Sequence, residues 1–277
     1  AFFGDCMLNG MAASIMDRDP ADPEKYWIHY HWNSYEQDGI YAMPNVDIRF
    51  KDINGKLLPV EIVISLREKG ETSPNAPLKK YRCSPGDGQK WEQAKRIARV
   101  SASLHGELDS HLCITHLNTE QYAIAVYRNI RENPVRFLIF PHIKEVALIN
   151  HSANKLLLGD DGYITRASGF TGSSINEHIR QVTGTLDWKN WQPRKPINDQ
   201  HRYALAGHLY WEFLEEYTGW YFDTFLDRIV EHWVEIRRFS SELVARSVPA
   251  FLCGYLQQNL QGTADRNSWF DWNERMD

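Results

Sequence analysis

Two histidines, His111 and His116, lie five residues apart in a stretch whose other residues favour a helix. In a regular α-helix each residue turns the chain by about 100°, so residues five apart point roughly 140° away from each other. A turn of π-helix widens the helix and brings such a pair onto one face, and such turns are frequent at functional sites. The spacing therefore predicts a widened helix that presents two imidazoles to one metal ion.

Two neutral imidazoles on a helix suit iron, zinc or copper, and ligands from elsewhere must complete an octahedral or facial site. The chain contains eleven histidines, so two of them at this spacing can also be unrelated surface or core residues. Spacing alone favours that second interpretation, and the metal hypothesis needs support from other features.

The remaining sequence predicts a mainly α fold with a small antiparallel β region at about residues 45–66. Two β-branched runs there flank Asn54-Gly55, a dipeptide typical of tight β-hairpins. From residue 90 to about residue 255 helical spacing predominates, and we expect Pro134 and Pro141 to separate the helices.

Two further segments carry structural predictions. Residues 163–165 predict a short strand inside a loop. The aromatic-rich segment 203–248 predicts one or two long helices, with most of its aromatic side chains in the core.

Composition excludes several classes of function. The net charge of -5 provides no basic surplus for phosphate binding, so we expect no nucleic-acid partner. The four cysteines are scattered and are interpreted as free thiols. The apolar runs are too short to cross a bilayer, and we expect a soluble, cytoplasmic protein, with peripheral membrane contact left open. Nucleotide-binding and serine-hydrolase motifs are not found.

His29 and His31 form a second pair, separated by one residue. On a strand, this spacing places both rings on one side, where they could chelate a metal. Because Trp27, Tyr30 and Trp32 surround the pair, an aromatic surface or core role is the favoured interpretation.

Longer stretches around His111 and His116 resemble the central iron-binding helix of the lipoxygenase family and the segments that follow it. The stretches are DSHLCITHLNTEQYAIAVYRNI at 109–130, NPVRFLIFPH at 133–142 and INHSAN at 149–154. Further similarity at 2–11, 57–66 and 203–213 extends the resemblance over about residues 2–245. The chain departs from the family pattern at Asn133, where a histidine is usual, and at Asn154, where an arginine is common.

The resemblance implies that His111 and His116 bind non-heme iron. In the family a third histidine, an asparagine or histidine and the terminal carboxylate complete the site, and none of these can be assigned within the 277 residues. We therefore expect residues 1–277 to form part of a lipoxygenase-like helical catalytic domain. A second polypeptide, which carries the C-terminal half and the remaining iron ligands, is expected to complete it.

The implied activity is oxygenation of a polyunsaturated fatty acid to a hydroperoxide, by hydrogen abstraction followed by addition of O2. The alternative is a noncatalytic lipid-binding or scaffold subunit. The apolar residues expected to line the substrate channel, which could equally be ordinary core, are Leu112, Ile149, Ala153, Leu157 and Leu158. Glu120, four residues after His116, could support that ligand or form a helix salt bridge.

Overall fold

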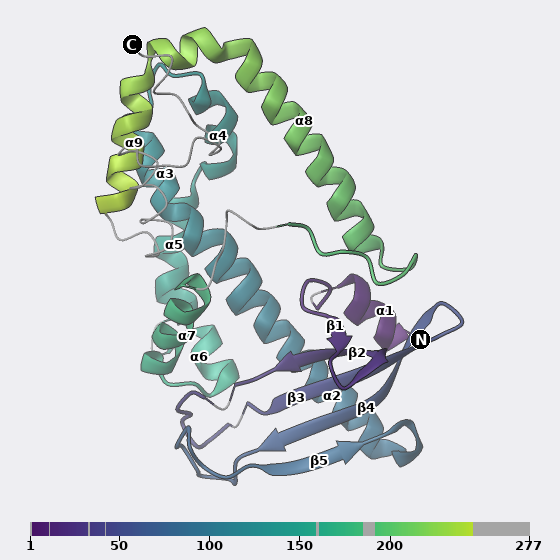
Figure 1. Ribbon diagram of the computed structural model, residues 1–277. Coiled ribbons are helices and arrows are strands. Elements are labelled where there is room, and N and C mark those ends of the chain that lie inside the picture. The colour runs from purple at the N-terminus through teal and green to yellow at the C-terminus, as the bar shows by residue number, and fades with distance from the viewer. Residues whose placement is uncertain are drawn as a thin grey trace. The chain divides into compact units, whose positions relative to one another are not determined.

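The computed structural model describes residues 2–10, 12–32, 34–41, 43–158, 161–184 and 192–245 (Figure 1). These residues form two compact units. The first unit contains described residues from 1–112, 153–179 and 192–215, and the second contains described residues from 113–152, 180–184 and 216–245.

A five-stranded antiparallel sheet is the centre of the first unit. Its strands lie side by side in chain order. They are β1 (Asp17–Asp19), β2 (Asp22–Tyr30), β3 (Asn45–Ile53), β4 (Lys56–Leu66) and β5 (Lys79–Cys83). The predicted hairpin is confirmed, because β3 and β4 pair across Asn54 and Gly55, whose positive φ angles of 54° and 74° are those a type I′ turn requires.

The sheet is larger than the predicted region 45–66, because β1, β2 and β5 extend it. These three strands lack a clear period-two pattern of apolar residues. β1 and β5 are short and mostly charged. In β2 the outward-facing positions include Trp27 and His29, so both faces of this strand carry ring side chains. The buried face of the sheet carries Ile28, Tyr30, Val46, Ile48, Phe50 and Ile62.

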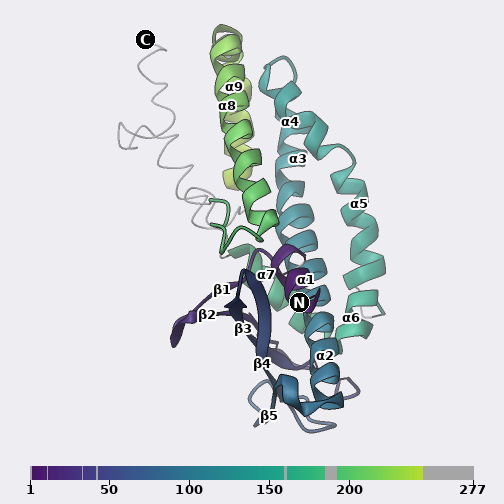
Figure 2. The same ribbon diagram turned by 90° about the vertical axis from the view of Figure 1, so that its right-hand side faces the viewer.

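Two helices pack against the sheet (Figure 2). Helix α2 (Gln89–His105) contacts strands β2 to β5 and buries Ala94 and Ala98, whose small side chains allow close approach. Helix α1 (Phe2–Asn9) contacts β4 so closely that a Cβ at Gly4 would lie 1.9 Å from the carbonyl oxygen of Leu57. Only glycine fits at that contact.

The predicted strand at residues 163–165 is wrong, because these residues begin helix α6 (Tyr163–Ser168). The helix starts directly after Gly162 and ends at Gly169, whose left-handed conformation (φ 70°) caps it. In so short a segment these end signals outweigh the β preference of one isoleucine and one threonine. Helix α7 (Gly172–Gly184) follows, after a 3-residue connection.

A π-helix, η2 (Gly106–Leu117), continues α2 and leads directly into α3 (Asn118–Asn129). The predicted widening around His111 and His116 is thus confirmed, and it extends over 12 residues instead of one turn. A second π-helical segment, η3 (Asn154–Leu158), follows α5 (Val146–Ala153).

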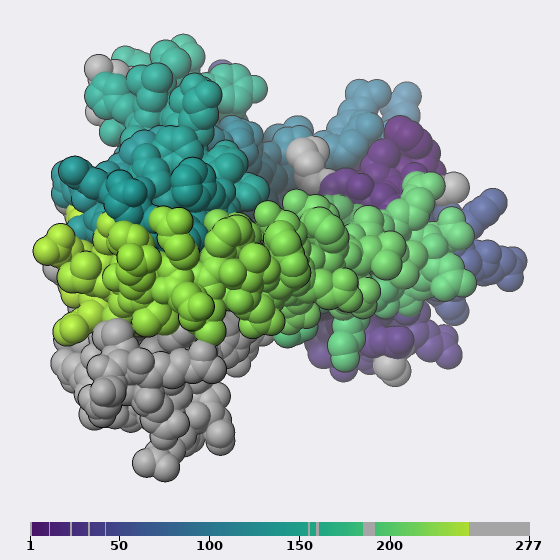
Figure 3. Space-filling model, turned by 90° about the horizontal axis from the view of Figure 1, so that it is seen from above, coloured from purple at the N-terminus to yellow at the C-terminus, as the bar shows by residue number. Residues whose placement is uncertain are grey.

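The second unit is helical. Residues from α3, α4 (Val135–Ile143), α5, α8 (Arg202–Glu231) and α9 (Trp233–Ala245) contribute to it. Its core consists of Ala123, Val126, Ile130, Val135, Ile143, Val146 and Ile229. In Figure 3 the yellow-green atoms of α9 lie against teal atoms of this unit, and α9 packs on α3. Pro141 does not end α4, which continues to Ile143.

Side chains in this unit hold the connection between α3 and α4. The Glu235 carboxylate accepts hydrogen bonds from the backbone N–H groups of Arg131, Glu132 and Asn133 at 2.8–3.2 Å. Asn133 is fully buried and donates to the carbonyl oxygens of Ile229 (3.0 Å) and His232 (3.2 Å). The residue that departs from the family pattern therefore ties this connection to the α8–α9 corner.

Long helices are confirmed within the segment 203–248 up to Ala245, and its last three residues lie outside the described part of the chain. The expected burial of its aromatic residues holds for Tyr221, at 7% exposed. It is wrong for Phe213, Tyr217 and Trp220, which are 41–57% exposed. Within the described residues no helix combines the length and apolar character that crossing a bilayer requires.

Candidate metal centre

The two histidines predicted to bind metal both belong to η2. A π-helix bonds each backbone N–H to the carbonyl five residues earlier, so residues i and i+5 follow one another on the same side of the helix. The His111 side chain is 54% exposed, and His116 is half-buried. The π-helical backbone therefore places His111 and His116 on the same side of the helix, whereas a regular α-helix would point them apart.

His111 is oriented by a carboxylate one helical turn earlier. Its Nδ1 lies 3.0 Å from Oε2 of Glu107. A carboxylate beside one ring nitrogen favours the tautomer with the proton on that nitrogen, and it increases the basicity of the other nitrogen. The contact thus favours the tautomer in which the lone pair of the His111 ring is on Nε2.

His116 is oriented by Asn150 of α5, in the same unit. Nδ1 of His116 lies 3.1 Å from Oδ1 of Asn150, which is only 3% exposed. The Nδ2 group of Asn150 donates to the His116 carbonyl oxygen (3.0 Å) and to Oε2 of Glu120 (2.9 Å). Because an amide oxygen only accepts, Nδ1 of His116 must be the protonated nitrogen in this contact.

Glu120 therefore reaches His116 through Asn150. Glu120 accepts this hydrogen bond from Asn150, and the alternative of a helix salt bridge is not what the contact shows. The role of Glu120 in metal binding stays a prediction.

A buried polar chain holds the first half of η2 in the first unit. Asp109 accepts from His105 Nδ1 (2.8 Å) and His178 Nε2 (2.5 Å), and His178 Nδ1 lies 2.9 Å from the Tyr35 hydroxyl. Burial raises the pKa of Asp109, but the hydrogen bonds from the two histidines outweigh it, so the pKa lies below its ordinary value. Asp109 therefore stays ionised and fixes η2 to α7 and to the loop that carries Tyr35.

The expected channel residues have different surroundings. Leu112 is 2% exposed and Ile149 is 46% exposed. Ala153, at the end of α5, and Leu157 and Leu158, at the end of η3, are half-buried. Their role in binding a fatty acid stays a prediction.

Several residues of this centre were missed by sequence reasoning, namely Tyr35, His105, Glu107, Asn150 and His178. Glu107 stands four residues before His111, a spacing that could have revealed the contact. Asn150 and His178 are 34 and 69 residues away from their partners, and no sequence signal indicates those contacts.

Comparison with known proteins identifies the family to which the chain belongs. The family model described as "Lipoxygenase" matches residues 29–179, more than half of the chain. A linolenate 9R-lipoxygenase from Nostoc is 26% identical over 240 residues, covering 77% of this chain and 30% of that protein. A 9R-lipoxygenase crystal structure from Cyanothece matches with a TM-score of 0.84 and 39% identity, covering 88% of this chain and 37% of the other.

A calcium-dependent 11R-lipoxygenase structure matches at 17% identity with a TM-score of 0.69, covering 90% of this chain and 42% of the other, and supports the fold alone. The chain thus spans about a third of the length of the Nostoc and Cyanothece relatives. The mainly helical fold with an antiparallel sheet, the widened helix and the family match agree, and the chain belongs to the lipoxygenase family.

Proposed function

We propose that the chain contributes His111 and His116 as two ligands of a non-heme iron, in an assembly that oxygenates a polyunsaturated fatty acid to a hydroperoxide. The observation that carries the proposal is that Nδ1 of each histidine faces an acceptor, Glu107 or Asn150, at 3.0 or 3.1 Å. Both Nε2 atoms are then the metal-binding nitrogens, and imidazole nitrogen suits iron.

Iron held by these residues would supply the redox chemistry for removing a hydrogen atom from a bis-allylic carbon of the fatty acid. O2 would then add at one end of the resulting pentadienyl radical, which gives a conjugated-diene hydroperoxide. The residues of this chain hold the site. Asp109 fixes the start of η2, while Glu107 and Asn150 set the tautomers of His111 and His116. Leu112, Ala153, Leu157, Leu158 and Ile149 are proposed to line the channel for the acyl chain.

The remaining iron ligands are proposed to come from polypeptide outside these 277 residues, in the form of a second polypeptide that carries the C-terminal half. The apolar surface of α8 supports this part of the proposal. Seven of its large side chains are 40–70% exposed, namely Tyr203, Leu205, Leu209, Tyr210, Phe213, Tyr217 and Trp220. Soluble proteins seldom leave so many apolar side chains of one element uncovered.

Reconstitution tests the proposal. The 277-residue chain is mixed with iron and with a histidine-bearing C-terminal polypeptide, and hydroperoxide formation from linolenate is followed by absorbance of the conjugated diene. We expect iron retention and turnover only with both polypeptides, and loss of both with His111→Ala or His116→Ala. The matched control is His151→Ala, an exposed histidine of α5 outside the proposed ligand pair. Full turnover by either ligand variant would contradict the proposal.

The second candidate function, a noncatalytic lipid-binding or scaffold subunit, is favoured by the same exposed surface of α8. It predicts that partner binding is unaffected by His111→Ala and His116→Ala and that no iron accompanies the complex. Metal analysis of the purified complex separates the two candidates. One iron per complex supports the enzyme, and an iron-free complex supports the scaffold.

A further inference from the structure

The face of the sheet opposite to its apolar core carries a cluster of two histidines and one carboxylate. It consists of His29, His31 and Asp47, and one potential ligand atom from each lies within 4.8 Å of the others. Among the described residues, no other set of three histidine, cysteine or acidic side chains meets this criterion. None of the three residues belongs to η2, so the cluster is separate from His111 and His116.

Strand register brings the three residues together. His29 of β2 lies directly opposite Asp47 of β3 in the antiparallel ladder, so both side chains are on the same face. His31 follows two residues after His29, just past the end of β2, and its ring returns to that face. Nδ1 of His29 and Nε2 of His31 both contact Oδ1 of Asp47, the latter at 3.1 Å.

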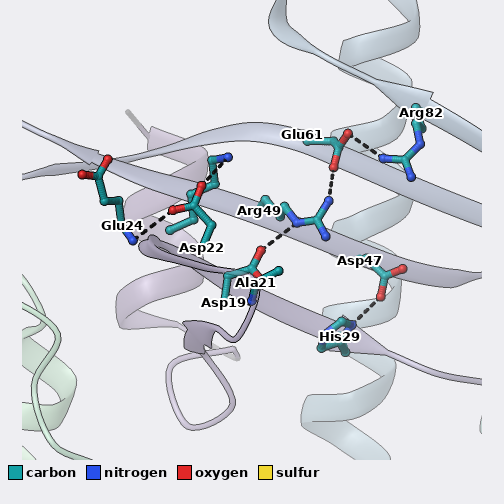
Figure 4. A network of polar contacts seen from close by, with 10 residues as sticks. Asp19, Ala21, Asp22, Glu24, His29, Asp47, Arg49, Glu61 and Arg82 are labelled. Atoms are coloured by element: carbon teal, nitrogen blue, oxygen red, sulfur yellow. Dashed lines mark hydrogen bonds and ion pairs between the residues drawn. The ribbon is translucent and has the colours of Figure 1, made fainter.

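The cation nearest to Asp47 along β3 is paired with other carboxylates. Across the sheet, on the β4 side, the neighbour of Asp47 is Val63. The nearest cation along β3 is Arg49, whose guanidinium is bonded to Asp19 and Glu61, while Glu61 also accepts from Arg82 (Figure 4). Because two carboxylates neutralise Arg49, a cation beside Asp47 meets little repulsion from it.

The Asp47 carboxylate is ionised, as a metal ligand must be. Burial raises the pKa of Asp47, but the hydrogen bonds from His31 and His29 outweigh this effect. The pKa therefore lies below its ordinary value and the carboxylate stays ionised. The Nε2 atom of His29 is buried without a hydrogen-bond partner, while the ring packs edge-on against Trp27. That ring is thus held in place by packing, with Nδ1 directed at Asp47.

We propose that His29, His31 and Asp47 form a second metal site, which binds a divalent cation of the zinc class with water completing the coordination. Two imidazoles and a carboxylate match zinc in ligand type, and three protein ligands plus water is a common zinc arrangement. Ligand atoms around tetrahedral zinc are about 3.3 Å apart, so side-chain rotations suffice to close the cluster from its present spread.

The site would act as a clamp on the first unit. It joins β2 to β3 at the point where the chain leaves β2 for the loop of residues 31–44. That loop carries Tyr35, whose hydroxyl contacts His178, and Gln37, which forms a β-bridge with Phe170. Bound metal would therefore stabilise the loop whose Tyr35 contacts His178, the partner of Asp109, without itself taking part in oxygenation.

Zinc binding to the 277-residue chain tests the proposal. Isothermal titration with Zn2+ is compared for the unmodified chain, Asp47→Asn and His31→Ala, and Co2+ absorption spectra report the ligand set. His142→Ala, an exposed histidine on α4, is the control, and circular dichroism checks that each variant is folded. Asp47→Asn preserves side-chain shape, so it changes the ligand without emptying the site.

We expect His142→Ala to bind zinc like the unmodified chain. In a His111→Ala/His116→Ala double variant, which removes the other candidate metal-binding pair, the zinc site of His29, His31 and Asp47 should remain. Asp47→Asn and His31→Ala should each weaken binding by more than about 100-fold, because loss of a direct ligand costs more than loss of a supporting contact. Failure of the unmodified chain to bind zinc would overturn the site. Equal zinc affinity in Asp47→Asn, or binding that disappears only in the double variant, would also overturn it.

Discussion

Asn150 is the residue whose substitution tests most sharply how the chain prepares His116. Replacement by alanine removes three hydrogen bonds, to Nδ1 and the carbonyl oxygen of His116 and to Glu120. At roughly 1 kcal/mol per bond the variant should lose about 3 kcal/mol of stability. His116 and Glu120 are half-buried, so water can reach the exposed groups and the loss falls toward about 2 kcal/mol.

The functional effect should exceed the effect on stability. Without the Asn150 acceptor, Nδ1 is no longer the favoured protonation site of His116, and iron affinity should fall by about 10- to 100-fold, as for other supporting contacts. Nitrogen NMR of histidine-labelled protein distinguishes the two ring tautomers, and urea denaturation followed by circular dichroism measures stability. We expect a Nδ1-protonated His116 in the unmodified chain and a mixture in Asn150→Ala.

Asn133→Ala provides a matched control. Asn133 is also a buried asparagine of the second unit with three hydrogen bonds, to Ile229, His232 and the N–H of Val135. It should cost a similar amount of stability while the tautomer of His116 stays unchanged. If Asn150→Ala leaves the tautomer and the metal affinity as they were, the orienting role assigned to Asn150 is wrong.

Three further predictions concern Glu107, Asp109 and Glu235. Glu107→Ala should weaken metal binding by about 10-fold while costing under about 1 kcal/mol, because this pair is exposed; Glu92→Ala on α2 is the control, and an unchanged metal affinity would refute the contact's role. Asp109→Ala should lower the free energy of unfolding by about 3–5 kcal/mol, because it removes the carboxylate partner of two histidines at a buried site. Asp161→Ala, at an exposed position, is the control, and equal melting temperatures of the two variants would contradict this prediction. Burial raises the pKa of Glu235, but three backbone N–H groups outweigh it and lower the pKa in the folded state. Its contribution to stability is therefore complete above the unfolded value of 4.5 and is lost as the pH falls through the lower folded value. Acid titration of helicity should show this loss, and Glu235→Gln should remove it; identical acid profiles would contradict the sign.

Much of the fold follows from local signals in the sequence. The Asn54-Gly55 turn specified its hairpin because a type I′ turn needs positive φ at both positions, and the spacing of His111 and His116 indicated the π-helix. Strands β1, β2 and β5 were missed because their inward and outward faces do not differ clearly in polarity. The false strand at Tyr163 shows that end signals can outweigh residue preference in a short segment.

The contacts around the two sites depend on long-range pairing, which one sequence does not reveal. Asp47 meets His29 because of the register between β2 and β3, and Asn150 of α5 meets His116 of η2 across 34 residues of sequence. The histidines themselves were found from their spacing and from the family resemblance. Their partners became visible only with the packed structure.

Diffraction at the iron absorption edge, from crystals of the chain assembled with iron and the proposed C-terminal polypeptide, tests the central claim most directly. We predict one anomalous peak at roughly 2 Å from Nε2 of both His111 and His116, the usual distance for metal–imidazole bonds. Glu107 and Asn150 should remain bonded to the two Nδ1 atoms. A peak that contacts only one of these rings, or rings that diverge with no metal between them, would contradict the account.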